Sequence, residues 1–156
     1  MSALLIASDH AGFTLKEKLR KYFGQKGIEV EDIGTYSRER CDYPEYAGKL
    51  AQLVSSGKSR RGVLICKSGI GNSIVANKFP GVRAALCHNL KTARLSREHN
   101  DSNVLVMGSA FVNAQLAKKM VSVWLKTDFL GGRHLKRVRL ISKIEQKIRR
   151  GEKWNI

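Results

Sequence analysis

The segment from Gly62 to Ser73 contains residue types that proton-transfer chemistry needs. A short apolar run over residues 63–65 leads directly to Cys66, and the sequence KSGIG follows at 67–71. Glycines let backbone N–H groups approach an anionic ligand closely, and a helix start adds a partial positive charge. A thiol in such surroundings has its thiolate favoured over that of an exposed cysteine. The segment therefore predicts a reactive thiol at the mouth of an anion-binding loop.

Three familiar loops of similar composition are excluded by counting. A cysteine-dependent phosphatase loop needs arginine six residues after its cysteine, and that position is Asn72. The nucleotide-binding pattern G-x-x-x-x-G-K-[ST] is absent, and Ile74 stands where a dinucleotide-binding loop has its third glycine. The alternative for Cys66 itself is an inert core residue beside an ordinary turn.

Length and composition indicate one globular domain. The 156 residues suffice for a hydrophobic core, and 42% hydrophobic residues with only 2 prolines argue against a disordered chain. The first residues lack the basic region of a signal peptide, and no apolar stretch reaches the roughly 18 residues of a membrane span. Cys41, Cys66 and Cys87 are not in C-x-x-C spacing, so we expect free thiols, a cytoplasmic location and no structural zinc.

The net charge of +16 is concentrated near the C-terminus. Residues 133–153 hold nine Lys or Arg against Glu145 and Glu152. Such a segment is typical of a solvated helix face, of phosphate binding or of polyanion binding. Nucleic acid is an unlikely partner, because the aromatic content of 7% includes no cluster of aromatics among these basic residues.

Strand and helix patterns alternate along the whole chain. Apolar or alternating runs predict strands at 4–8, 28–33, 63–66, 83–87 and 104–107, with 28–33 as an outer strand. Periodic apolar residues predict helices at 15–23, 46–54, 73–78, 92–99 and 117–124, and a last one from 134 onward. Right-handed crossovers turn this order into an α/β fold, a Rossmann-like three-layer sandwich with a five-stranded parallel sheet and an extra C-terminal helix.

Parallel strands carry their ligand-binding residues at one edge. The first strand ends at Asp9 and His10, and the central strand ends at Cys66 and Ser68. Ligands of such sheets bind beyond the carboxyl ends of the strands, so we expect these side chains to share one site.

The last predicted helix, residues 134–150, has two features of its own. It has an apolar stripe although the sheet is already covered, so we expect it to pack on a partner subunit in at least a dimer. Arg133 and Arg137 follow the flexible pair Gly131-Gly132 and lie four residues apart on one helical face. They are candidates for a phosphate clamp, and plain surface arginines are the alternative.

Five groups of residues, in order between about residues 4 and 148, resemble one family. They are Asp9-His10-Ala11-Gly12; Asp42-Tyr43-Pro44; Cys66 with Ser68-Gly69-Ile70-Gly71 and residues 73–78; Ser96-Arg97-Glu98-His99-Asn100-Asp101; and Gly131-Gly132-Arg133-His134 with Arg137. Together they are similar to B-type ribose-5-phosphate isomerase, in the wider group with the galactose-6-phosphate isomerase subunits.

The resemblance implies an intramolecular oxidoreductase that interconverts ribose 5-phosphate and ribulose 5-phosphate without metal or organic cofactor. It makes Cys66 the base that moves a proton between C2 and C1 through a cis-enediolate. Backbone N–H groups of residues 67–71 then stabilise the oxyanion, assisted by the hydroxyl of Ser68, where the family usually has threonine. His99 becomes the acid that opens the furanose ring.

The resemblance also supplies the substrate-binding residues and an assembly. The site would lie between two subunits of a homodimer or homotetramer, within a single sugar-phosphate isomerase domain over 1–156. His88 and His134 are predicted to be structural or peripheral, and the histidine spacing does not suit a metal. The predicted substrate-binding residues are Asp9, His10, Tyr43, Lys67, Gly69, Ile70, Gly71, Asn100, Arg133 and Arg137.

Two positions depart from the family pattern and leave the substrate open. Ala110 stands where an arginine commonly contacts phosphate, and Lys67 stands where glycine is common. We expect Lys67 or another basic residue to compensate, or the substrate to differ in length. The alternatives are isomerisation of an allose, galactose or erythrose phosphate, and a catalytically inactive basic protein that binds nucleic acid.

Overall fold

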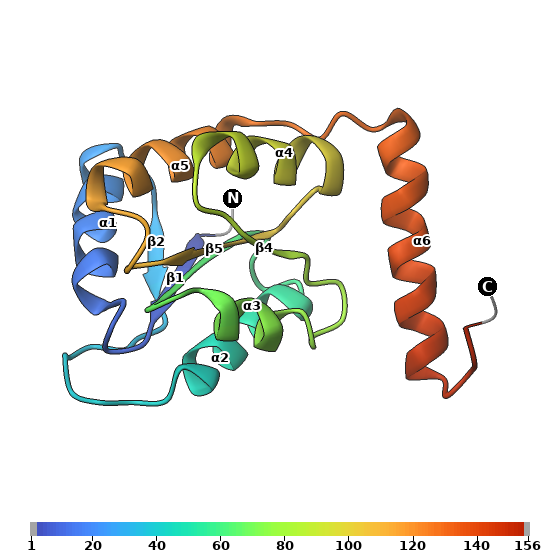
Figure 1. Cartoon of the computed structure of the whole chain (residues 1–156), viewed down its shortest axis with the longest axis horizontal. Helices are drawn as coiled ribbons and strands as arrows, with labels where there is room; N and C mark the ends of the chain where they lie inside the picture. Colours follow the sequence, from blue (N-terminus) through green and yellow to red (C-terminus); the bar gives the residue numbers. More distant parts are fainter. Residues whose placement is uncertain (1–2, 155–156) are drawn as a thin grey trace.

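The computed structural model describes residues 3–154 and has a five-stranded parallel sheet with the order β2-β1-β3-β5-β4. The α/β class and the five parallel strands are confirmed, and Figure 1 shows helices on both sides of the sheet. The strands are β1 (Leu4–Ser8), β2 (Val30–Asp32), β3 (Gly62–Cys66), β4 (Ala84–Leu86) and β5 (Val104–Gly108). The helices are α1 (Phe13–Gln25), α2 (Tyr43–Ser55), α3 (Ile70–Ala76), α4 (Leu90–Asn100), α5 (Ala114–Lys126) and α6 (Gly132–Arg149).

The two faces of the sheet have separate hydrophobic cores, because successive strand residues point to opposite faces. On one face, Ile6 and Ile65 pack with Leu19 of α1 and Trp124 of α5, and α4 joins them. On the other face, Leu64 packs with residues of α2 and α3. The three central strands β1, β3 and β5 are buried along their whole length, as their continuous apolar runs predict.

Several element ends differ from the predicted ones. The outer strand covers only Val30–Asp32 instead of 28–33, since an edge strand has one neighbour and pairs with β1 over three residues. The helix after the glycine loop spans Ile70–Ala76 and not 73–78. Its earlier start places Gly69 and Ile70 at the helix entrance, next to the end of β3.

Helix α6 stands apart from the sheet, and α4 is the element it packs against most closely within residues 3–154 (Figure 1). It begins at Gly132 and ends at Arg149, close to the predicted 134–150. A hollow of about 620 Å³ separates it from the body of the protein, and the Glu145 carboxylate spans this hollow to accept the N–H of Gly81 at 3.0 Å. Its apolar Leu140, Ile141 and Ile148 are exposed.

Residues 3–154 lack two kinds of feature. No described helix combines the length and apolar character that crossing a membrane requires. The same residues hold no group of three or more His, Cys, Asp or Glu side chains arranged to bind a metal ion.

Candidate active site

The register of the sheet brings two predicted clusters to one edge. Ser8 at the end of β1 pairs with Ile65 of β3, so Asp9 and His10 emerge beside Cys66. The N–H of Asp9 donates to the carbonyl of Ile65 at 3.3 Å, and this bond fixes the start of the first loop against the central strand. Cys66, Asp9 and His10 therefore lie together on one side of the molecule.

Cys66 is almost completely buried, and its sulfur lies close to backbone N–H groups of the glycine loop. Its exposed fraction is 3%, and the N–H of Gly69 donates to Sγ at 3.1 Å. Burial raises the pKa of the Cys66 thiol, and the Asp9 carboxylate adds to that rise, while N–H groups of Gly69, Asn72 and Ser68 oppose it. The predicted lowering of this pKa is therefore wrong, because the loop donors do not offset the loss of solvent around the sulfur.

The glycine loop is packed so tightly that two of its positions exclude a side chain. Gly69 has φ +81, and a Cβ there would lie 2.5 Å from Cδ1 of Leu86. A Cβ on Gly71 would lie 2.4 Å from Cζ of Tyr43, so the Tyr43 ring covers the loop. The hydroxyl oxygen of Ser68 accepts the N–H of Ile70 at 3.2 Å, which shapes the turn that follows the thiol.

Asp9 and His10 are held by neighbouring backbone. The Asp9 carboxylate accepts the N–H of Gly12 at 2.9 Å, which orders the turn before α1. Nδ1 of His10 lies 3.1 Å from the carbonyl oxygen and 3.2 Å from the amide nitrogen of Cys41. The loop between β2 and α2 thus fixes the His10 ring, and Nε2 is the nitrogen left for a ligand.

A buried ion pair that sequence reasoning missed anchors this loop. Lys16 is fully buried and pairs with the carboxylate of Asp32 at the end of β2. The other oxygen of Asp32 accepts the N–H of Gly34 at 2.9 Å. The carbonyl of Gly34 in turn accepts the N–H of Ser8 at 2.7 Å. No periodicity or motif reveals this link, because it joins residues 16 and 32 only through the fold.

Two buried polar atoms near the thiol also escaped sequence reasoning. Ser8 Oγ and Asn72 Oδ1 are buried and have no hydrogen-bond partner among the described residues. Ser8 directly precedes Asp9, and Asn72 lies in the first turn of α3. The spacing of Asn72, six residues after Cys66 where a phosphatase loop has its arginine, is the sequence feature that could have indicated this residue.

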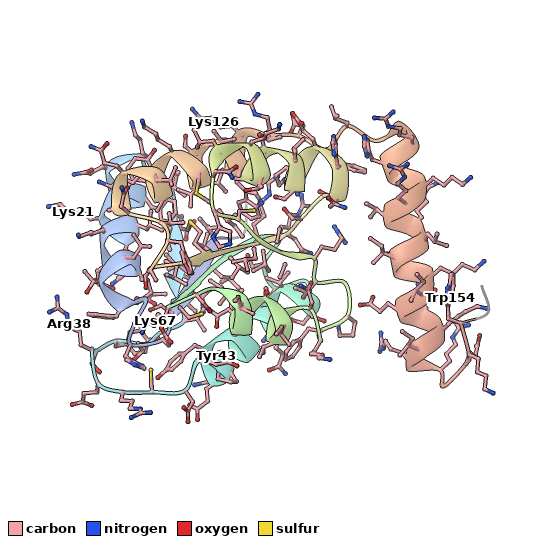
Figure 2. All side chains as sticks on the ribbon, in the orientation of Figure 1. Lys21, Arg38, Tyr43, Lys67, Lys126 and Trp154 are labelled. Carbon is pink, nitrogen blue, oxygen red and sulfur yellow. The ribbon has the colours of Figure 1, made fainter. Side chains whose placement is uncertain are left out.

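The other four predicted site residues lie at the opposite edge of the sheet. Helix α4 starts after β4 and runs back, so His99 and Asn100 come at its far end. The carbonyl of Asn100 accepts Nε of Arg83, which directly precedes β4, at 3.0 Å. Arg133 and Arg137 lie in the first turns of α6 beside them. Figure 2 shows Lys67 and Tyr43 on the far side of the molecule from α6.

This second cluster contains a histidine pair. The rings of His99 and His134 stack at 4.1 Å between centroids with an interplanar angle of 6°. Burial lowers the pKa of His134, and the neighbouring His99, Arg133 and Arg137 lower it further. The prediction that His134 is structural or peripheral stays a prediction, and the stacking on His99 is compatible with a structural role for its buried ring.

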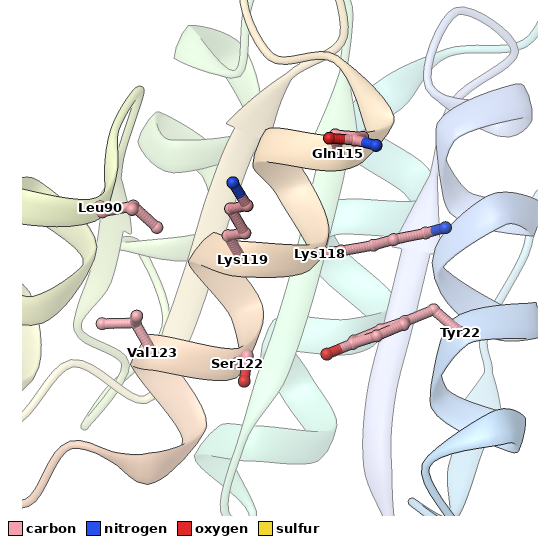
Figure 3. A pocket seen from close by; sticks show the side chains of 7 residues that line it. All are labelled: Tyr22, Leu90, Gln115, Lys118, Lys119, Ser122 and Val123. Atoms are coloured by element: carbon pink, nitrogen blue, oxygen red, sulfur yellow. The ribbon is translucent and has the colours of Figure 1, made fainter.

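A groove elsewhere on the surface has none of the predicted site residues. It lies between α1 and α5, has a volume of about 490 Å³ and includes Tyr22, Lys118 and Lys119 (Figure 3). The ammonium of Lys118 stands 5.8 Å from the centre of the Tyr22 ring. Because its lining includes no predicted site residue, we do not assign the chemistry to it.

Comparison with known proteins gives one consistent group. The Ribose/Galactose Isomerase family model matches residues 4–141. The chain is 47% identical to ribose-5-phosphate isomerase B of Escherichia coli, covering 94% of this chain and 99% of that protein. It is 43% identical to a putative sugar phosphate isomerase of Bacillus subtilis, covering 91% of this chain and 96% of the relative.

Solved structures agree with this grouping. Ribose-5-phosphate isomerase B of Clostridium thermocellum superposes with a TM-score of 0.91 at 47% identity, covering 94% of this chain and 99% of the other. The Mycoplasma genitalium protein of the same name, solved with bound ribulose 5-phosphate, gives a TM-score of 0.88 at 39% identity. The coverage in that case is 93% of this chain and 97% of the other.

Proposed function

This chain belongs to the ribose/galactose isomerase family, and from that premise we propose the reaction and the roles of its residues. It is an isomerase that interconverts ribose 5-phosphate and ribulose 5-phosphate. The observation that carries the chemical proposal is the position of Cys66 Sγ, 3.1 Å from the N–H of Gly69 at the entrance of the glycine loop. The Cys66 thiol, as the base, therefore lies next to the backbone N–H groups that can stabilise an oxyanion.

Cys66 acts as the base of the proton transfer. Its thiolate takes the proton from C2 of the open-chain aldose, and the C1 carbonyl oxygen becomes the enediolate oxygen. The proton of the C2 hydroxyl then passes to O1, and the Cys66 thiol returns its proton to C1, so that C2 becomes the carbonyl of the ketose. The backbone N–H groups of residues 67–71, with the Ser68 hydroxyl, stabilise the negative charge that develops on oxygen. No redox cofactor or metal enters this balance, because the hydrogen moves within one substrate molecule.

The remaining residues bind the sugar phosphate. Asp9 and His10 face the sugar beside the thiol, and Tyr43 covers the loop at Gly71. Arg133 and Arg137 are exposed guanidiniums at the start of α6, and their planar forks suit phosphate oxygens. His99 supplies the acid that opens the ring, and Asn100 holds sugar hydroxyls.

A complete site requires a second copy of the chain. Cys66 lies at the carboxyl edge of the sheet, whereas His99 and Arg133 lie at the amino edge of the same subunit. We propose that His99 of the partner subunit and the partner subunit's Arg133 complete the site at Cys66. The exposed apolar residues of α6 support this assembly, because a partner would cover them. The result is a homodimer or homotetramer of one-domain subunits, with residues 134–150 packed on the partner.

The cytoplasm is the compartment that suits this chemistry. The three cysteines of the chain are free, and a catalytic thiol must stay reduced. An oxidising compartment would convert the base into a disulfide or an oxidised sulfur that cannot accept a proton.

Turnover with matched variants tests the proposal. The purified protein is assayed for ketose formation from ribose 5-phosphate, with allose, galactose and erythrose phosphates in parallel. Ribose 5-phosphate should give the highest kcat/KM, and Cys66→Ala should lower kcat by at least about a hundredfold. Cys87→Ala, which removes a buried thiol on another strand end, is the control. Full activity in Cys66→Ala would remove the thiol from the mechanism.

A further inference from the structure

A hollow at the amino edge of the sheet gathers four arginines. It has a volume of about 430 Å³ and lies between the end of α2, the segment before β3 and the end of α4. Arg60, Arg61, Arg83 and Arg97 line it together with one carboxylate, that of Asp101. None of the predicted substrate-binding residues is part of its lining. We propose that this hollow binds a small phosphoryl anion at a place separate from the sugar-phosphate site.

The lining carries an excess of positive charge. Four guanidiniums and one carboxylate give a net charge of +3. Asp101 is shared, because its two oxygens accept from Nη2 of Arg83 at 3.0 Å and from Nη1 of Arg97 at 2.7 Å. Arg60 and Arg61 have no carboxylate within 4.0 Å among residues 3–154. Two of the four cations therefore face the hollow without an ionic partner.

Arg61 is held in place for this role. Its Nη1 donates to the carbonyl of Leu125 at 2.8 Å, and its guanidinium lies over the ring of the buried Trp124 at 5.4 Å. A guanidinium fixed by packing loses little side-chain freedom when it binds an anion. Burial and the nearby Arg97 lower the pKa of Arg61, and Asp101 and Asp128 only partly oppose this. An added anion would relieve that repulsion.

The chemistry of the lining selects the ligand class. Guanidinium forks bind phosphate oxygens in pairs, and the +3 charge favours an anion with two or more negative charges. No aromatic side chain lines the hollow, so nothing there would stack on a nucleobase. Inorganic phosphate and pyrophosphate are the simplest anions of this class, and pyrophosphate can reach two arginines at once.

Calorimetric titration with sodium pyrophosphate tests the site. Saturating ribose 5-phosphate is present, so that the sugar-phosphate site is occupied. The wild type should still bind pyrophosphate, and Arg61→Gln should bind it about tenfold more weakly, the loss expected for one charge-assisted contact. Arg60→Gln should show a smaller loss and serves as a second variant, because Arg60 is exposed and its replacement leaves the packing on Trp124 intact.

Two controls separate this site from its competitors. Lys21→Gln removes the same charge from exposed α1 and should bind pyrophosphate like the wild type. Arg137→Gln impairs the proposed substrate phosphate contact and should also retain binding. An equal loss of pyrophosphate affinity in Lys21→Gln would indicate diffuse charge attraction. A loss of pyrophosphate binding in Arg137→Gln would assign the binding to the sugar-phosphate site. Either result, or no pyrophosphate binding by the wild type, would overturn the proposal. A failure here leaves turnover untouched, so it is distinguishable from failure of the proposed function.

Discussion

The backbone N–H of Ala110 donates a hydrogen bond to the carbonyl oxygen of Lys67, with 3.0 Å between nitrogen and oxygen. The preceding residue continues the link, because the N–H of Ser109 donates to the carbonyl of Cys66 at 2.9 Å. Ala110, which occupies the position that resemblance assigns to a phosphate-binding arginine, thus lies beside the exposed Lys67 at the loop entrance. A positive charge is kept in the same neighbourhood on a different segment.

We therefore predict that Lys67 takes over the phosphate contact. Lys67→Ala should raise KM for ribose 5-phosphate by about tenfold or more, since a hydrogen bond to a charged group contributes about 1.5 to 3 kcal/mol. Steady-state kinetics measure this, and Lys21→Ala is the matched control for net charge. The double variant Lys67→Gly with Ala110→Arg should recover most of the lost affinity. An unchanged KM in Lys67→Ala would show that this lysine has no such role.

The pH dependence of the reaction should reflect the buried thiol. Burial raises the pKa of Cys66, so its thiolate fraction grows only as the pH rises through that higher value. If the thiolate is the base, kcat/KM should increase with pH across the alkaline range, above the roughly 8.5 of an exposed thiol. The rate of Cys66 alkylation by iodoacetamide, followed in a Cys41→Ser, Cys87→Ser background, should rise over the same pH range. A thiol already fully ionised at neutral pH would contradict this assignment.

The substitution Gly71→Ala should disturb the packing of the Tyr43 ring against the glycine loop. The Cβ of Gly71→Ala would lie 2.4 Å from Cζ of Tyr43, so the ring or the loop has to move. We expect a loss of about 1 to 3 kcal/mol in the free energy of unfolding, with reduced kcat/KM. Gly24→Ala is the control, since nothing lies within 4 Å of its new Cβ in α1. That change should raise stability by about 0.5 to 1 kcal/mol. Denaturant titration compares the two, and equal effects would deny the Tyr43 contact.

The sequence predicted the sheet because its central strands are continuous apolar runs. Residues 63–65 and 104–107 could only be covered on both faces, and the structure buries them completely. Asp9, His10 and Cys66 were expected at one edge for the same reason, since strand ends in a parallel sheet meet there. Edge strands were harder to delimit, because pairing with a single neighbour decides their length.

The features that the sequence did not predict correctly, or did not predict at all, depend on distances between residues that are far apart in the chain. The direction of the Cys66 pKa shift follows from how completely the sulfur is buried. The sequence shows the loop N–H donors that lower this pKa, but it does not show the burial that raises it more. The ion pair of Lys16 with Asp32 and the stacking of His99 on His134 join residues that only the fold brings together. Lys16 even lies beside the apolar stripe of α1, where a charged residue would be expected to face solvent.

The separation of Cys66 from His99 within one subunit gives a test of shared sites. Cys66→Ala and His99→Asn should each be inactive alone, since every composite site then lacks one group. In a heterodimer of the two variants, one site combines both lesions and the other has both native residues. The heterodimer purified through two affinity tags should therefore recover about half of the wild-type activity, and an unfractionated random mixture of dimers about a quarter. If the purified heterodimer stays inactive while each subunit folds, Cys66 and His99 do not meet across an interface, and the assembly proposed for this chain is wrong.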